Sequence, residues 1–134
     1  AALPFGRRRM VELARALEAR GCAAINMSSG GLDPHQQVPV GPGYQVPLAR
    51  AVKQATNLPV VAVGLVTGFE QAEAIIATGD ADMVGLARTI LYDPRWPWHA
   101  AAHLGASVDA PDQYLRSAPR QYRALFASKE SAGS

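Results

Sequence analysis

The sequence has 134 residues but only one cysteine, Cys22. A single thiol excludes an internal disulfide and a cysteine metal cluster, which fits a reducing compartment. No apolar run approaches the roughly 20 residues of a membrane-spanning helix, and the first residues lack the basic-then-apolar order of a signal peptide. We therefore expect a cytoplasmic protein without a membrane partner. Cys22, at the start of an apolar run, is predicted to be a buried, inert thiol.

The net charge is small, at +2, and aromatic residues make up only 7% of the chain. No basic stretch is interleaved with aromatic residues in the way that a single-strand-binding surface requires. We therefore expect no nucleic-acid partner. The basic residues near the C-terminus are interpreted as a solvated face, and they are Arg116, Arg120, Arg123 and Lys129.

Three short apolar runs are predicted to be strands buried on both faces, at 22–27, 59–63 and 81–86. They alternate with helical patterns, and this order predicts an α/β fold with parallel pairing and right-handed crossovers. A loop at 28–46, rich in glycine and proline, is long enough to be functional.

The helical segments are bounded by start and stop signals. Gly21 and Gly79 supply left-handed stops, and Thr67 with Glu70 forms a capping box. The tail at 127–134 is expected to be flexible. The predicted helical segments are 7–20, a helix beginning at Pro47, 67–79, a short turn at 88–92, 93–105 and an amphipathic stretch at 114–126.

The length of the chain limits the architecture. A closed (β/α)₈ barrel needs about 200 residues at least, and only three strands are predicted here. A small doubly wound sheet and the last three-eighths of a barrel both remain open. We favour a partial barrel domain at 1–126, because the sequence begins on a helix with no strand before it. A three-stranded piece leaves two bare sheet edges and needs a partner or the missing half.

Two consecutive predicted strands end in small residues, Gly64 and Ala87, and Arg88 follows the second. Exposed N–H groups at such ends, with a helix next, favour a phosphate group. The doubled arrangement resembles the phosphate site of a (β/α)₈ barrel and predicts a phosphorylated cofactor. Two structural alternatives stay open: Gly64 as a turn glycine, and Arg88 in an ion pair with Asp82 or Asp93.

Other candidate side chains favour structural roles. His99 and His103 have a zinc-compatible spacing, but no glutamate lies between them and no third ligand is evident, so no metal site is expected. His35 is attributed to turn chemistry, and Trp96 and Trp98 to packing.

Six segments in order resemble the C-terminal part of the Old Yellow Enzyme family, and its bacterial, thermophilic-like subgroup is the most similar. These flavoproteins are NAD(P)H-dependent ene-reductases on an FMN-binding (β/α)₈ barrel. The segments span roughly Val11 to Arg116, and they are Asn26–Gly31, Pro42–Pro47, Ala62–Thr67, Ala81–Arg88, Asp93–Pro97 and Ala110–Arg116.

The resemblance implies roles for five residues. Main-chain N–H groups of Gly64, Ala87 and Arg88 would hold the FMN phosphate, with the Arg88 guanidinium adding charge. Ser29 would donate its hydroxyl near the phosphate. Arg116 matches an arginine that enters the neighbouring subunit's active site, although a longer tail replaces the aromatic residue that usually ends the family's chains.

The resemblance also implies what this sequence does not carry. The family's substrate-anchoring His-His or His-Asn pair, its tyrosine proton donor, its flavin-ring contacts and an arginine near the flavin N1 lie in the first five strands. No catalytic residue is therefore assigned here, and the chain is expected to be incomplete alone. The reductant would be NADPH or NADH, the substrate a small electrophile such as an enone, and the assembly a homo-oligomer or one completed by the N-terminal half.

Two rival functions remain open. Another barrel enzyme acting on a sugar phosphate would share the two-strand phosphate site without binding flavin. A non-catalytic interaction module would use its bare sheet edges to pair with another chain.

Overall fold

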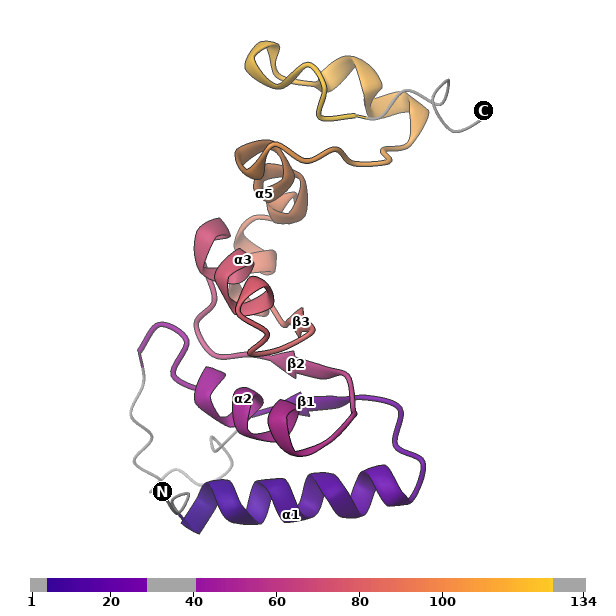
Figure 1. Ribbon diagram of the computed structural model, residues 1–134. Helices are drawn as coiled ribbons and strands as arrows, with labels where there is room; N and C mark the ends of the chain where they lie inside the picture. Colours follow the sequence, from indigo (N-terminus) through magenta and orange to yellow (C-terminus); the bar gives the residue numbers. More distant parts are fainter. Residues whose placement is uncertain (1–4, 29–40, 127–134) are drawn as a thin grey trace. The chain divides into compact units, whose positions relative to one another are not determined.

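A computed structural model describes residues 5–28 and 41–126 (Figure 1). The chain forms two compact units that divide between Ala87 and Arg88. Most of the predicted long loop, including Ser29, and the tail at 127–134 lie outside the described residues, as does His35.

The first unit is an alternation of helices and parallel strands. The strands pair in the order β1-β2-β3, with Ile25 opposite Val60 and Ala62 opposite Val84. The predicted parallel α/β fold is confirmed, and it is consistent with part of a (β/α)₈ barrel. The elements are α1 (Phe5–Ala19), β1 (Ile25–Met27), α2 (Val46–Ala55), β2 (Val60–Ala62), α3 (Phe69–Ala77) and β3 (Met83–Val84).

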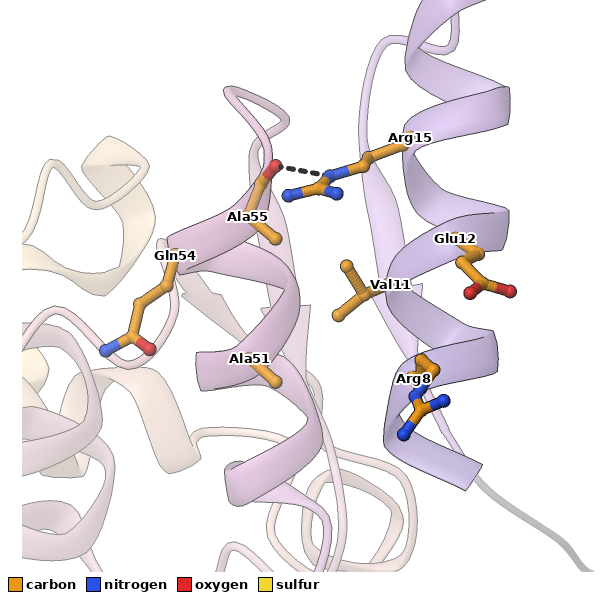
Figure 2. A pocket seen from close by; sticks show the side chains of 7 residues that line it. All are labelled: Arg8, Val11, Glu12, Arg15, Ala51, Gln54 and Ala55. Carbon is orange, nitrogen blue, oxygen red and sulfur yellow. Dashed lines mark hydrogen bonds between the residues drawn. The ribbon is translucent and has the colours of Figure 1, made fainter. Parts of the chain in front are cut away.

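Helix α1 packs against α2, and α1 ends one residue before its predicted end (Figures 1 and 2). Val11 of α1, 8% exposed, points toward α2. Arg15 donates from Nε to the Ala55 carbonyl at 3.3 Å and so satisfies one of the unpaired carbonyls at the end of α2. Gly21, at φ +85°, ends α1 in the left-handed conformation predicted for it.

The sheet is buried on one face only. Helix α2 contacts β1 and β2, and Met27, Val60 and Ala62 are each 1% exposed or less. On the other face Asn26 is exposed and Met83 is 43% exposed. The prediction that the strands are buried on both faces is therefore wrong for the described chain. The strands are also shorter than predicted, at three, three and two residues.

Two local predictions fail for identifiable reasons. Helix α3 begins at Phe69 with Gly68 as its N-cap, and no side-chain cap hydrogen bond is made there, so the predicted Thr67 capping box is wrong. Cys22 precedes β1 and is half-buried rather than buried, because β1 starts three residues later.

The second unit consists of α4 (Arg88–Tyr92), α5 (Trp96–Leu104) and the 3-10 segments η1 (Asp112–Ser117) and η2 (Arg120–Tyr122). Gly105 ends α5 at φ +72°, as predicted. The amphipathic helix predicted at 114–126 is wrong. Pro111 and Pro119 are the N-cap residues of η1 and η2. A proline disfavours helical backbone at the residue before it, so Pro119 interrupts the stretch.

Aromatic side chains join the segments of this second unit. Trp98 lies edge-on to Tyr114 and Phe126, with ring centroids 5.5 and 5.1 Å apart. Trp96 is 8% exposed. Trp98 therefore packs against aromatic rings of its own unit and Trp96 is buried, in line with the packing role predicted for both.

Within the part of the chain that the structure describes, no helix is both long enough and apolar enough to cross a bilayer.

Candidate anion site at the carboxyl edge of the sheet

Gly64 and Ala87 lie at the same edge of the sheet. Ala62 and Val84 are paired in parallel register, and Gly64 and Ala87 follow them by two and three residues. The structure thus brings these two predicted residues together at the edge where the strands end. Arg88 follows Ala87 directly and is the first residue of α4.

The main chain after β2 has an unusual conformation. Gly64 has a φ of +111°, and Leu65, the next residue, has a φ of +52°. A Cβ on Gly64 would lie 3.0 Å from Cγ of Gln45 and 3.0 Å from Cε1 of Tyr44. Residue 64 must therefore be glycine for two reasons, its left-handed φ and the absence of space for a side chain.

The turn before α2 packs on this glycine. The N–H of Gly43 donates to the Gly64 carbonyl at 2.9 Å. Gln45 is 3% exposed and donates from Nε2 to the Tyr44 hydroxyl at 2.6 Å. The segment Pro42–Pro47 carries the family resemblance, but sequence patterns assign no individual role to Tyr44 or Gln45. Their pairing with Gly64 depends on the path of the loop, which local patterns do not reveal.

Gln71 holds the same loop from α3. Its Oε1 accepts from the Thr67 N–H at 3.1 Å, and its Nε2 donates to the Leu65 carbonyl at 3.4 Å. Sequence reasoning missed this residue. Its place in the first turn of α3 was the available signal, because a glutamine there can reach back to main-chain groups before the helix.

The chain after β2 differs in one respect from the sequence prediction. The sequence places a helix directly after both strand ends, but α3 begins five residues beyond Gly64, at Phe69. The dipole of α3 therefore does not begin at Gly64. Within the described residues, the N–H groups of Gly64, Leu65 and Ala87 donate no hydrogen bond. These unpaired donors, rather than a helix end, are what this edge offers an anion.

Carboxylates lie at the opposite edge, where the strands begin. Asp80 binds Arg50 through two contacts of 2.5 and 2.8 Å, and this hydrogen bonding holds the pKa of Asp80 below its ordinary value. Asp82 binds Lys53 at 2.5 Å and accepts the Val60 N–H at 2.8 Å. Lys53 first, and then the Val60 N–H, lower the pKa of Asp82.

The remaining candidates belong to the second unit. Asp93, which lies just before α5, pairs with Nδ1 of His99 in that helix at 2.7 Å. The partner of His99 in this contact is therefore a carboxylate rather than a second histidine. The alternative ion-pair partners weighed for Arg88 are thus engaged by Lys53 and His99. Arg116 is exposed on η1.

The fold and this edge define a class: a parallel α/β protein with unpaired main-chain donors where two neighbouring strands end. Comparison with known proteins then identifies the family. Residues 14–106 match the NADH:flavin oxidoreductase / NADH oxidase family. The chain belongs to this family.

Bacterial relatives agree with that assignment. The chain is 42% identical over 107 residues to an NADPH dehydrogenase of Halalkalibacterium halodurans, which covers 80% of this chain and 31% of that protein. It is 42% identical over 106 residues to an NADPH dehydrogenase of Geobacillus sp. strain WCH70, covering 79% and 31%. An NADPH dehydrogenase of Listeria innocua is 37% identical over 107 residues, covering 80% and 31%. The chain thus spans about a third of the length of the curated relatives it matches.

Proposed function

We propose that this chain is the C-terminal, FMN-phosphate-binding part of an FMN-dependent NAD(P)H oxidoreductase of the ene-reductase type. In this proposal its three strands belong to a (β/α)₈ barrel. The family match and the relatives' shared name, NADPH dehydrogenase, support the class of reaction. The observation that carries the proposal is the left-handed main chain at Gly64 and Leu65, whose N–H groups donate no hydrogen bond to any described residue.

The residues at this edge fit a phosphate group. The N–H groups of Gly64, Leu65 and Ala87 have no partner among the described residues. We assign the phosphate to these donors and to Arg88, whose guanidinium would add a charge-assisted hydrogen bond. Ser29 would donate its hydroxyl, as the family resemblance implies.

The reaction chemistry belongs to the cofactor, because FMN supplies hydride transfer when it is bound. The residues of this chain would bind and orient its phosphate, and no residue here is assigned to proton transfer or substrate anchoring. We therefore propose that the chain is not catalytically complete alone. The whole protein would use NADPH or NADH to reduce a small electrophile such as an enone, as a cytoplasmic homo-oligomer in which Arg116 reaches a neighbouring active site.

Calorimetric titration of the purified chain with FMN, riboflavin and inorganic phosphate tests the proposal. FMN should bind and riboflavin should bind at least tenfold more weakly, because riboflavin lacks the phosphate. Adding NADPH should produce no turnover. Equal affinity for the two flavins would contradict the phosphate site, whereas tight stoichiometric FMN with NADPH turnover would contradict incompleteness. Thermal stabilisation by a sugar phosphate, without FMN binding, would instead favour a sugar-phosphate enzyme.

A further inference from the structure

We propose that Tyr44, Gln45 and Gln71 are positioning residues that fix the loop 64–67 in its anion-binding conformation. The inference rests on the proposed function, since it concerns the same edge of the sheet. None of the three side chains is assigned a contact with the phosphate. They act on main-chain groups, and the main chain presents the donors.

The first support comes from the turn before α2. The ring of Tyr44 and the Cγ of Gln45 occupy the space where a Cβ of residue 64 would stand, each at 3.0 Å. The hydrogen bond from Gln45 Nε2 to the Tyr44 hydroxyl, at 2.6 Å, fixes the two side chains relative to each other. The Gly43 N–H holds the Gly64 carbonyl at 2.9 Å, so the peptide after residue 64 is fixed in direction.

The second support comes from α3. Gln71 uses both ends of its amide group, accepting from the Thr67 N–H and donating to the Leu65 carbonyl. Because α3 is a regular helix, the position of Gln71 is set by secondary structure rather than by the loop itself. The loop is therefore tied at residues 65 and 67 to the first turn of α3.

The two supports are adjacent. A Cβ on Gly43 would lie 3.3 Å from Nε2 of Gln71, the nitrogen that donates to the Leu65 carbonyl. The turn before α2 and the first turn of α3 thus meet beside the loop. A left-handed φ is unfavourable at Leu65, which is not a glycine, unless the surroundings hold it, and these contacts do so.

The chemistry of the supports suits positioning rather than binding. A phenol and two carboxamides are uncharged, so they can hold the main chain without introducing a negative charge that would repel phosphate. A loop held in its bound conformation before the ligand arrives binds more tightly, because less conformational entropy is lost on binding. The three side chains should therefore affect affinity for FMN but not for riboflavin.

The sharpest test compares Gln71→Ala with Gln54→Ala, the same substitution on α2. Alanine favours the helix at both positions. Gln71→Ala should weaken FMN binding about tenfold, as expected for two lost hydrogen bonds, and leave riboflavin binding unchanged. The phosphate-induced NMR shifts of the Leu65 and Thr67 amides should also decrease. Gln54→Ala should behave like the unmodified chain.

A second pair of variants separates the ring of Tyr44 from its hydroxyl. Tyr44→Phe keeps the ring against Gly64 and should cost about threefold in FMN affinity, whereas Tyr44→Leu removes the ring and should cost about tenfold. The amide spectrum shows whether each variant is folded. If Tyr44→Leu does not fold, Gln71→Ala decides the question alone.

The outcomes distinguish this inference from the proposed function. If the unmodified chain prefers FMN over riboflavin and Gln71→Ala retains that preference in full, the positioning role is wrong and the proposed function stands. If the unmodified chain shows no preference for FMN, both fail. A loss of affinity for FMN and riboflavin by the same factor would show that Gln71 supports the fold generally, and would overturn the positioning role.

Discussion

At the edge where the strands begin, charged side chains pair with one another, whereas at the edge where they end, neutral side chains hold the main chain. Asp80 and Asp82 bind Arg50 and Lys53, and Asp82 also accepts the N–H that opens β2. At the carboxyl edge the contacts to Gly64 come from a tyrosine ring and a glutamine. The charged groups at the first edge are therefore paired with one another, whereas at the second edge the N–H groups of Gly64, Leu65 and Ala87 have no partner among the described residues.

This difference separates stability from function within one small sheet. In parallel α/β folds, residues at the amino ends of strands mostly serve stability, while those at the carboxyl ends serve binding and catalysis. The ion pairs join α2 to the turns before β3 and so hold the layers together. Substitutions at the two edges should accordingly change different measurements.

Arg88→Ala should have the largest effect on ligand binding. It removes the cation that we assign to the FMN phosphate, and a charge-assisted hydrogen bond contributes about 1.5–3 kcal/mol. The dissociation constant for FMN should rise by roughly ten- to 150-fold, with no change in thermal stability. Arg120→Ala, an exposed arginine on η2, is the control. An unchanged dissociation constant for Arg88→Ala would remove Arg88 from the site.

Gly64→Ala should lower both stability and FMN affinity. The left-handed φ and the 3.0 Å approach of Tyr44 and Gln45 make alanine unfavourable, by about 1–3 kcal/mol in the free energy of unfolding. Urea unfolding and FMN titration measure the two effects.

Gly68→Ala is the matched control for that substitution. Gly68 has a φ of −86°, and its Cβ would lie 3.8 Å from the nearest atom, an ordinary contact. Its unfolding free energy should change by about 0.5 kcal/mol or less. Equal effects at positions 64 and 68 would show that the carboxyl edge is not strained.

Asp80→Asn should affect stability alone. The change keeps the shape of the side chain but removes the charge that binds Arg50. The Asp80 side chain is 11% exposed and that of Arg50 is 54% exposed, so solvent screens the pair in part. We expect the melting midpoint to fall by a few degrees while the FMN dissociation constant stays the same. Asp109→Asn, at an exposed aspartate, should change neither, and a weaker FMN affinity in Asp80→Asn would show that the edges are coupled.

The sequence predicts the frame of this molecule better than its details. Gly21, Gly79 and Gly105 all have the positive φ expected of helix stops, because few other residues adopt that conformation. The placement of Gly64 and Ala87 at one edge was also predictable, since the strands are parallel. Strand lengths were not, because an apolar run does not reveal how many of its residues have a neighbour in register.

The supports of the loop could not be predicted for a different reason. Tyr44 and Gly64 are twenty positions apart in the sequence, with α2 and β2 between them, so their contact depends on tertiary packing. The capping box failed at the same place, because Gly68 rather than Thr67 precedes the helix and Gln71 takes the Thr67 N–H. Long-range packing decided the local conformation.

The smallest expected effect is that stability, which depends on one edge, and FMN affinity, which depends on the other, change in different pH ranges. Hydrogen bonding to Arg50 and Lys53 lowers the pKa of Asp80 and Asp82 below the ordinary value of 3.8. As the pH falls below that value, the unfolded chain takes up protons before the folded chain does, so the stability from these pairs is present above about pH 4 and lost below it.

The phosphate of FMN gains its second proton near pH 6, so its affinity for the carboxyl edge should fall between about pH 7 and 5. Melting midpoints and FMN dissociation constants should be measured from pH 7.5 to 3. The dissociation constant should rise in a higher pH range than the one in which the melting midpoint decreases. A double variant carrying Asp80→Asn and Asp82→Asn should lose the acid-dependent part of its stability. It should keep the pH dependence of FMN binding. If the melting midpoint of the double variant still falls as steeply below pH 4, the assignment of that stability to the amino edge is refuted.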